Sequence, residues 1–186
     1  MTAVPDPEVL FTAEQFALRP DPGYPEELVQ GRIVAMPMPK PHHESICNKA
    51  GRIFGNYVEE HRLGRVLNND TGVMTRRDPD TVRGAAIAYY SYQRLPEGEI
   101  PDHYAEVAPE LVVEVRSPGD RWPSILAKVA EYLEAGVSVV VVLDYDRRAA
   151  HLFADDGTHR MLGIDDELTI PELLGEFRVL VRTFFD

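Results

Sequence analysis

A single carboxylate, Glu114, stands within a segment that is otherwise typical of a buried β-strand. In the sequence LVVEVR, residues 111–116, successive side chains point to opposite faces of the expected strand, so Glu114 shares its face with Val112 and Arg116. Burying a carboxylate is costly unless a metal ion, a cation or hydrogen bonds compensate for the lost hydration. The sequence therefore predicts a partner for Glu114.

A cationic candidate lies on the helix expected directly after this strand. The connection 117–120, SPGD, ends the strand, and the apolar spacing predicts a helix from about Trp122 to Ala135 that stops at Gly136. Lys128 falls at the edge of the buried stripe of this helix. Its amino group could extend to solvent or reach over the strand toward Glu114.

Two kinds of partner for Glu114 remain open at this point, a divalent metal ion and a basic side chain. An ion pair with Lys128 or with Arg116 would be purely structural, and residues two apart on a strand are separated by about 7 Å, which long side chains can bridge. Glu110 points the same way as Glu114 but lies about 13 Å along the strand, too far to share one ion easily.

These segments resemble the Uma-two family of putative restriction endonucleases, within the PD-(D/E)XK nuclease superfamily. The resemblance is carried by PELVVEVRSPGD, by Lys128, Tyr132 and Gly136, and by VVVVLDYDRRAAHLF. It extends to FTAEQFALRP, EELVQGRIVAMPMP and VRGAAIAYYSYQRLP, and so covers most of the chain. It implies an α/β, restriction-endonuclease-like fold, in which α-helices flank a mixed, curved β-sheet.

The resemblance also implies a chemistry. In that superfamily two acids on neighbouring strands hold a divalent metal, and a lysine assists the attack of water on a phosphodiester. Glu114 would be the second acid and a ligand of Mg²⁺, and Lys128 would be the lysine, moved from strand to helix. Glu27 and His43 match peripheral family residues. The alternative for Glu27 is a solvated acid on an edge strand, and for His43 it is capping or packing at a helix start.

The chain departs from the family pattern at three positions. Ala86 stands where the family has the first metal-binding aspartate, Glu110 stands where it has an aspartate, and Arg116 replaces the lysine of Glu-x-Lys. Glu110 and Arg116 therefore join Glu114 and Lys128 as candidate catalytic residues. Two loop aspartates ahead of Ala86, at positions 78 and 80, are candidates for the missing acid, although such residues usually form turns.

Composition limits the class of protein. The 186 residues, 44% hydrophobic and 27% charged, predict one domain, residues 11–186, after a flexible N-terminal tail, residues 1–10. The single cysteine, Cys47, excludes an internal disulfide and fits a reducing cytoplasm. No apolar run approaches the roughly 20 residues that cross a bilayer, so the expected location is cytoplasmic and no membrane partner is expected.

The net charge of −12 argues against broad nonspecific binding to DNA, so a DNA partner requires a local basic surface. An apolar C-terminal stretch, from Phe177 to Phe184, suggests strand pairing or a homodimer. The candidates for the basic surface are Arg76, Arg77, Arg83, Arg116, Arg121 and Lys128.

Local patterns predict the remaining elements. A strand from Val137 to Leu143 should lie parallel to the Glu114 strand, because a helix connects the two. The other expected elements are a helix opened by Thr12, a hairpin of strands 26–30 and 32–38, a helix reaching Arg62, two short strands turning at Asn69-Asp70 within 64–75, a strand 86–92, a surface excursion 94–109, strands 149–153 and 158–162, and a short helix 171–176.

Two functions follow as hypotheses. The first is an Mg²⁺-dependent DNA endonuclease, either active or degenerate because Ala86 cannot bind a metal. The second is a non-catalytic binding module that retains the nuclease scaffold. A cleft in which Glu114 meets solvent, Lys128 and a basic rim would favour the enzyme, whereas Glu114 saturated by arginine contacts would favour the module.

Overall fold

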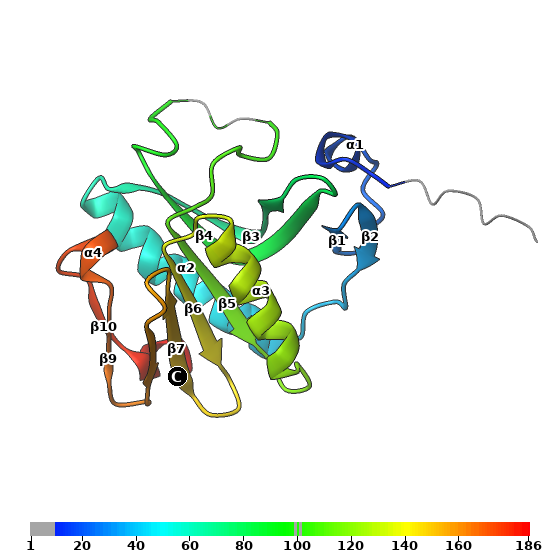
Figure 1. Ribbon diagram of the computed structural model, residues 1–186. Coiled ribbons are helices and arrows are strands. Elements are labelled where there is room, and N and C mark those ends of the chain that lie inside the picture. Colours follow the sequence, from blue (N-terminus) through cyan, green and yellow to red (C-terminus); the bar gives the residue numbers. More distant parts are fainter. Residues whose placement is uncertain (1–9, 99, 101) are drawn as a thin grey trace, which may run out of the picture.

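The computed structural model describes residues 10–98, 100 and 102–186 (Figure 1). Residues 1–9 of the expected tail lie outside these ranges. The helices are α1 (Ala13–Ala17), α2 (Pro41–Glu60), α3 (Trp122–Glu134), α4 (Pro171–Leu174) and the 3₁₀ helix η1 (Val181–Phe184). The strands are β1 (Glu26–Val29), β2 (Arg32–Ala35), β3 (Gly64–Arg76), β4 (Thr81–Ser91), β5 (Leu111–Arg116), β6 (Val139–Asp144), β7 (Ala149–Ala154), β8 (His159–Leu162), β9 (Glu167–Thr169) and β10 (Arg178–Leu180).

One mixed sheet of eight strands organises the chain. Its strand order is β2-β1-β4-β5-β6-β7-β8, and β3 pairs with the other edge of β4. Strands β5 and β6 pair in parallel, as the intervening helix predicts. All other neighbouring strands in this sheet pair antiparallel. The chain therefore has the mixed α/β architecture that the sequence predicts.

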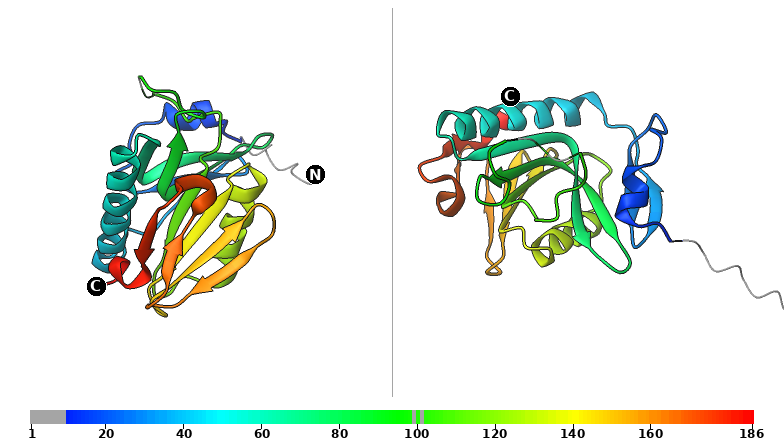
Figure 2. Two further views of the ribbon diagram at one scale, coloured as in Figure 1. Left: turned by 90° about the vertical axis from the view of Figure 1, so that its left-hand side faces the viewer. Right: turned by 90° about the horizontal axis from the view of Figure 1, so that it is seen from above.

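Helices cover the two faces of the sheet, so that the molecule has three layers (Figure 2). The long helix α2 packs on one face with α4 and η1, over Leu111, Val113 and Val115 of β5. Helix α3 packs on the other face, over Val112 of β5 and Val140 and Val142 of β6. The predicted alternation of β5 is therefore confirmed, and it places Glu114 on the α3 face.

The edge of β4 that faces β1 and β5 has a gap. Strand β1 pairs with β4 at Val82, through Leu28, and β5 pairs with it from Ile87 to Tyr89. Between them, residues 83–86 have no strand partner on this edge in the described part of the chain. Because main-chain groups in such a gap must find other partners, side chains can take the place of a strand here.

The two short strands expected within 64–75 form one strand instead. Asn69 and Asp70 do not turn the chain but form a bulge within β3, with positive φ angles of 66° and 56°. The pairing resumes because β4 is longer than expected, beginning at Thr81 rather than Ala86, and offers a partner along the whole of β3. The prediction of a turn at Asn69-Asp70 is wrong.

The apolar C-terminal stretch packs within the chain's own core. Strand β10 pairs with β9, which the sequence reading missed, and Phe177, Val181 and Phe184 are buried in the cluster under α2. These side chains thus have intramolecular partners, and the homodimer stays a prediction. In the described part of the chain, no helix has the length and apolar character needed to cross a bilayer.

Candidate active site

A cavity of about 530 Å³ lies where α3, the start of α2 and the β1–β2 hairpin meet the sheet. Its wall includes Glu27, Glu114 and Lys128, which the sequence brings from β1, β5 and α3. Its other lining residues include His43, Asp70, Gly84, Ala86, Arg121 and Lys40. Most of the residues singled out by the sequence thus converge on one place.

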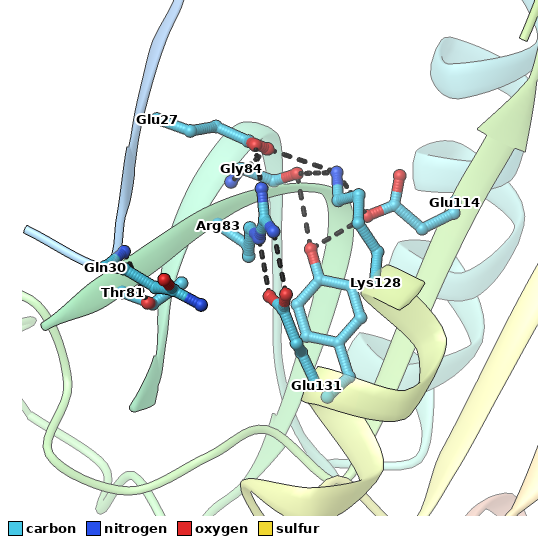
Figure 3. Close-up of polar contacts among 9 residues, drawn as sticks. Glu27, Gln30, Thr81, Arg83, Gly84, Glu114, Lys128 and Glu131 are labelled. Carbon is cyan, nitrogen blue, oxygen red and sulfur yellow. Dashed lines mark hydrogen bonds and ion pairs between the residues drawn. The ribbon is translucent and has the colours of Figure 1, made fainter. Parts of the chain in front are cut away.

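Glu114 occupies the floor of the cavity, with only 9% of its side chain exposed. Its Oε1 accepts a hydrogen bond from the hydroxyl of Tyr132 at 2.8 Å and lies 3.0 Å from Nζ of Lys128. No hydrogen bond or ion pair among the described residues involves its Oε2 (Figure 3). Half of this buried carboxylate therefore remains free to bind a ligand.

Lys128 uses its ammonium group to join three parts of the chain (Figure 3). Nζ donates a hydrogen bond to the carbonyl oxygen of Gly84 at 3.0 Å and forms ion pairs with Oε1 of Glu27 at 3.2 Å and Oε1 of Glu114 at 3.0 Å. Three protein oxygens therefore surround this ammonium group. The ion pair Glu114–Lys128 considered from the sequence is confirmed.

Glu27 is buried, with 4% of the residue exposed, and so the interpretation of it as a solvated edge-strand acid is wrong. Its Oε2 accepts a hydrogen bond from Arg83 at 2.8 Å, and its Oε1 accepts one from the main-chain N–H of Gly84 at 3.1 Å. Arg83 in turn forms a bidentate pair with Glu131 of α3, at 2.6 and 2.8 Å. Side chains thus fill the gap along β4 at Gly84.

The ionisation states within this network follow from burial and charge. Burial raises the pKa of Glu27, but Lys128 and Arg83 outweigh this effect and leave the pKa below its ordinary value. Burial lowers the pKa of Lys128, but Glu114 and Glu27 outweigh it and the net pKa is raised. Lys128 is therefore a cation at neutral pH and does not act as a general base.

Glu110 does not reach the cavity. It precedes β5 and accepts hydrogen bonds from the main-chain N–H of Ser91, at 2.9 Å, and from the Ser91 hydroxyl. Nε of Arg94 lies 3.3 Å from its Oε1. Its carboxylate therefore binds the turn that follows β4. This turn lies at the opposite end of β5 from the connection to α3, so Glu110 is separated from Glu114.

Arg116 does not pair with Glu114 either. Its guanidinium donates hydrogen bonds to Asp144 at 2.7 Å and Asp146 at 3.0 Å. Asp144 lies directly beside Arg116 in the parallel register of β5 and β6. A cross-strand neighbour is closer, at about 5 Å, than a residue two positions along the same strand. The alternative of a Glu114–Arg116 ion pair is therefore wrong. Arg116 is not among the residues that line the cavity.

His43 and Ala86 both line the cavity, but neither provides an acid. His43 lies in the first turn of α2, with Nδ1 3.6 Å from Glu44 and 3.5 Å from Sγ of Cys47. The candidates for the missing acid do not line the cavity. Asp80 accepts a hydrogen bond from the main-chain N–H of Ala13 at 2.8 Å, and Asp78 lies in the same turn after β3.

The sequence reading missed three charged residues of this site, Asp70, Arg83 in its pairing role, and Glu131. Asp70 was assigned to a turn, yet it is exposed, lines the cavity and lies in the bulge of β3. Glu131 lies three residues after Lys128, and this helical spacing is a signal that could have placed both side chains on one face of α3.

The predicted basic surface is mostly neutralised. Arg83 and Arg116 are held by acids, and Arg77 pairs with Glu14 and Asp80. Among the six predicted cations, Arg121 and Lys128 line the cavity, and Lys40 is an exposed lysine that was not predicted there. A basic rim at the cavity therefore rests on Lys40 and Arg121.

The side chains present fit a hard divalent cation held largely by water and substrate oxygens. Within the described residues, no three His, Cys, Asp or Glu side chains form a preformed metal cage. Mg²⁺, however, usually takes one or two carboxylates and completes its shell with water and phosphate. The free Oε2 of Glu114 and the carboxylate of Asp70 on the same cavity supply that donor set.

Comparison with known proteins identifies the fold and the family of the chain. A putative nuclease of the DUF820 group from Anabaena variabilis has the same fold, with a TM-score of 0.81 over 94% of this chain and 97% of that chain, at 19% identity. No curated protein matches the chain. The family model described as "Putative restriction endonuclease" matches residues 13–182. The chain, with its restriction-endonuclease-like α/β fold, therefore belongs to the Uma2 family of putative restriction endonucleases.

Proposed function

We propose that this protein is a metal-dependent endonuclease that hydrolyses phosphodiester bonds of DNA in the cavity around Glu114. The observation that carries the proposal is Oε2 of Glu114, the oxygen of a mostly buried side chain that faces the cavity and has no hydrogen bond or ion pair among the described residues. A mostly buried carboxylate gains from nearby cations, and a metal ion at Oε2 would add to the pairing that Lys128 gives through Oε1.

Each residue of the site has a defined task in this proposal. Glu114 would hold Mg²⁺ through Oε2. When bound, the ion would supply an activated water molecule and stabilise negative charge on the phosphate. Lys128 pairs with Oε1 of Glu114 and is held by the carbonyl of Gly84, so Lys128 is a positioning residue in the observed arrangement. Lys40 and Arg121, at the rim, would contact DNA phosphates.

One observation favours the second candidate, a non-catalytic DNA-binding module. The ammonium group of Lys128 already contacts three protein oxygens, and Ala86 offers no carboxylate. In such a module the same network would only hold α3 to β1 and β4. The two candidates differ in whether the cavity requires a metal ion.

Nicking of supercoiled plasmid in Mg²⁺ and then Mn²⁺ tests the proposal. The wild-type protein should nick DNA, Glu114→Gln should abolish nicking, and Ala86→Asp should increase it by adding a carboxylate. Asp155→Asn, in the exposed turn after β7, removes one negative charge away from the cavity and serves as the matched control. Thermal unfolding of each variant distinguishes loss of chemistry from loss of fold.

Two outcomes would contradict the enzyme. Nicking by Glu114→Gln at the wild-type rate would show that the cut is made elsewhere or by a contaminant. Nicking by Ala86→Asp alone would show that the natural chain has lost its chemistry. In that case, binding of a fluorescent DNA duplex in EDTA, measured by anisotropy, would support the binding module.

A further inference from the structure

The bulge of β3 sets Asp70 against the position where an acid is missing. On either side of the bulge, Asn68 pairs with Ile87 and Thr71 pairs with Ala85. Asn69 and Asp70 therefore both stand opposite Ala86. A β-bulge re-aims the side chain of its extra residue, and Asn and Asp tolerate the left-handed backbone that it needs. The bulge thus brings a carboxylate from β3 to the cavity that Ala86 lines.

Asp70 is packed closely against the centre of the site. A Cβ atom built on Gly84 would lie 3.2 Å from Cβ of Asp70, so the absence of a side chain at Gly84 provides the room for Asp70. Gly84 is also the residue whose carbonyl accepts the hydrogen bond from Lys128. No hydrogen bond or ion pair among the described residues engages the Asp70 carboxylate, which is exposed and lines the cavity.

The charge balance around the cavity favours a cation. The buried network contains three carboxylates, Glu27, Glu114 and Glu131, against two cations, Arg83 and Lys128, which leaves one negative charge in excess. Asp70 adds a second. The pKa of Cys47, raised to about 12 chiefly by burial, is raised further by Glu44, Asp70 and Glu114. Asp70 and Glu114 therefore act on the same small region.

We propose that Asp70 replaces the acid missing at Ala86 and, together with Oε2 of Glu114, forms a site for a hard divalent cation such as Mg²⁺ or Mn²⁺. The inference rests on the proposed function, and it adds a ligand that the family pattern does not assign. Two carboxylates leave the remaining positions of an octahedral ion to water and to the oxygens of a phosphate.

Binding of Mn²⁺ alone, without DNA, tests this site. Free Mn²⁺ can be followed by electron paramagnetic resonance during titration of the full-length chain. Asp70→Asn and Glu114→Gln should each weaken Mn²⁺ affinity by about tenfold or more, since each removes one charged oxygen ligand. Asp155→Asn makes the same charge change at an exposed turn away from the cavity and should leave the affinity unchanged.

A rescue variant separates ligation from general electrostatics. In the double variant Asp70→Asn/Ala86→Asp, a carboxylate returns from the opposite strand, and Mn²⁺ affinity should recover to within about threefold of wild type. Thermal unfolding without metal verifies that each variant is folded. The inference is overturned if the wild-type chain binds no Mn²⁺ at millimolar concentration, or if Asp70→Asn binds it as the wild type does.

The two proposals can fail independently. Asp70-dependent Mn²⁺ binding without any nicking would support the proposed metal site and contradict the proposed nuclease activity. Nicking that depends on Glu114 but not on Asp70, with unchanged Mn²⁺ affinity in Asp70→Asn, would support the nuclease proposal and exclude Asp70 as a ligand of its metal ion.

Discussion

The ammonium group of Lys128 donates a hydrogen bond to the main-chain carbonyl of Gly84 at 3.0 Å, where a neighbouring strand would otherwise provide the donor. A side chain of α3 thus provides one of the hydrogen-bond partners of β4 in the gap between β1 and β5. The same nitrogen forms ion pairs with Glu27 and Glu114. Lys128 therefore contributes to the stability of the fold, in addition to its proposed role in positioning Glu114.

Replacing Lys128 should destabilise the fold strongly. Lys128→Met leaves Glu27 and Glu114 without their shared cation, and breaking a buried ion pair from one side costs about 3–5 kcal/mol. Unfolding by urea, followed by circular dichroism, measures the change in the free energy of unfolding. Adding Glu114→Gln should restore part of the loss, because one of the uncompensated charges is removed.

Arg148→Met is the matched control for Lys128→Met. Arg148 pairs with Asp186, and their side chains are 50% and 59% exposed. Such a surface pair contributes about 0–1 kcal/mol. Equal losses in the two variants would mean that the buried network contributes no more than a solvated ion pair.

Acid should remove the contribution of Glu27 to stability. Its folded-state pKa is lowered from 4.5, so its stabilising effect is present above pH 4.5 and is lost as the pH falls through the folded-state value. The difference in unfolding free energy between the wild type and Glu27→Gln should therefore be largest above pH 4.5 and narrow below it. Denaturant curves at a series of pH values provide the measurement, and a difference that stays constant on acidification would exclude the ion pairs of Glu27 as its source.

The thiol of Cys47 should report on the charge of the cavity. Its pKa is raised to about 12, first by burial and then by Glu44, Asp70 and Glu114. Cys47 is the only cysteine, so the pH dependence of alkylation by iodoacetamide reports on this thiol alone. Asp70→Asn should shift the alkylation curve to lower pH, whereas Asp155→Asn should not. An unchanged curve in Asp70→Asn would place the two side chains too far apart to interact.

The effect of a substitution at Asn69 on stability should depend on whether the new residue tolerates a left-handed backbone, rather than on its polarity. Asn69 has a φ of 66°, and a β-branched residue in this conformation costs about 1–2 kcal/mol. Asn69→Val should therefore lower the free energy of unfolding by that amount, and Asn69→Gly should change it little. Thermal or urea unfolding measures both, and equal effects of Val and Gly would show that the Asn69 side chain, not its backbone, matters.

Local patterns were sufficient to predict β5 and α3. The alternation of residues 111–116 and the helical spacing after Trp122 determine which faces are buried, and the parallel connection to β6 then places α3 over Glu114. These elements alone place Lys128 within reach of Glu114, one of the alternatives that the sequence left open. This proximity was predictable because both residues belong to one strand–helix–strand unit.

Contacts between distant segments were not predictable in the same way. Glu27 reaches the site because β1 pairs with β4 beside the gap, a register that no local pattern in the hairpin specifies. The sequence Asn69-Asp70 fits a turn and a bulge equally well, since both need a left-handed backbone. Spacing along one strand made Arg116 one possible partner of Glu114, but Arg116 pairs instead with the closer Asp144 on β6.

The gap along β4 also determines how Glu27 is held. Strand β1 meets β4 at Leu28 and Val82, so much of the attachment of the hairpin near the site runs through the Glu27 carboxylate rather than through a ladder of main-chain bonds. Amide hydrogen exchange in β1 and β2 can therefore report an opening that leaves the β5–β6 core protected. Such an opening would carry Glu27 away from Lys128 and Arg83, and so would change the charge of the cavity without global unfolding.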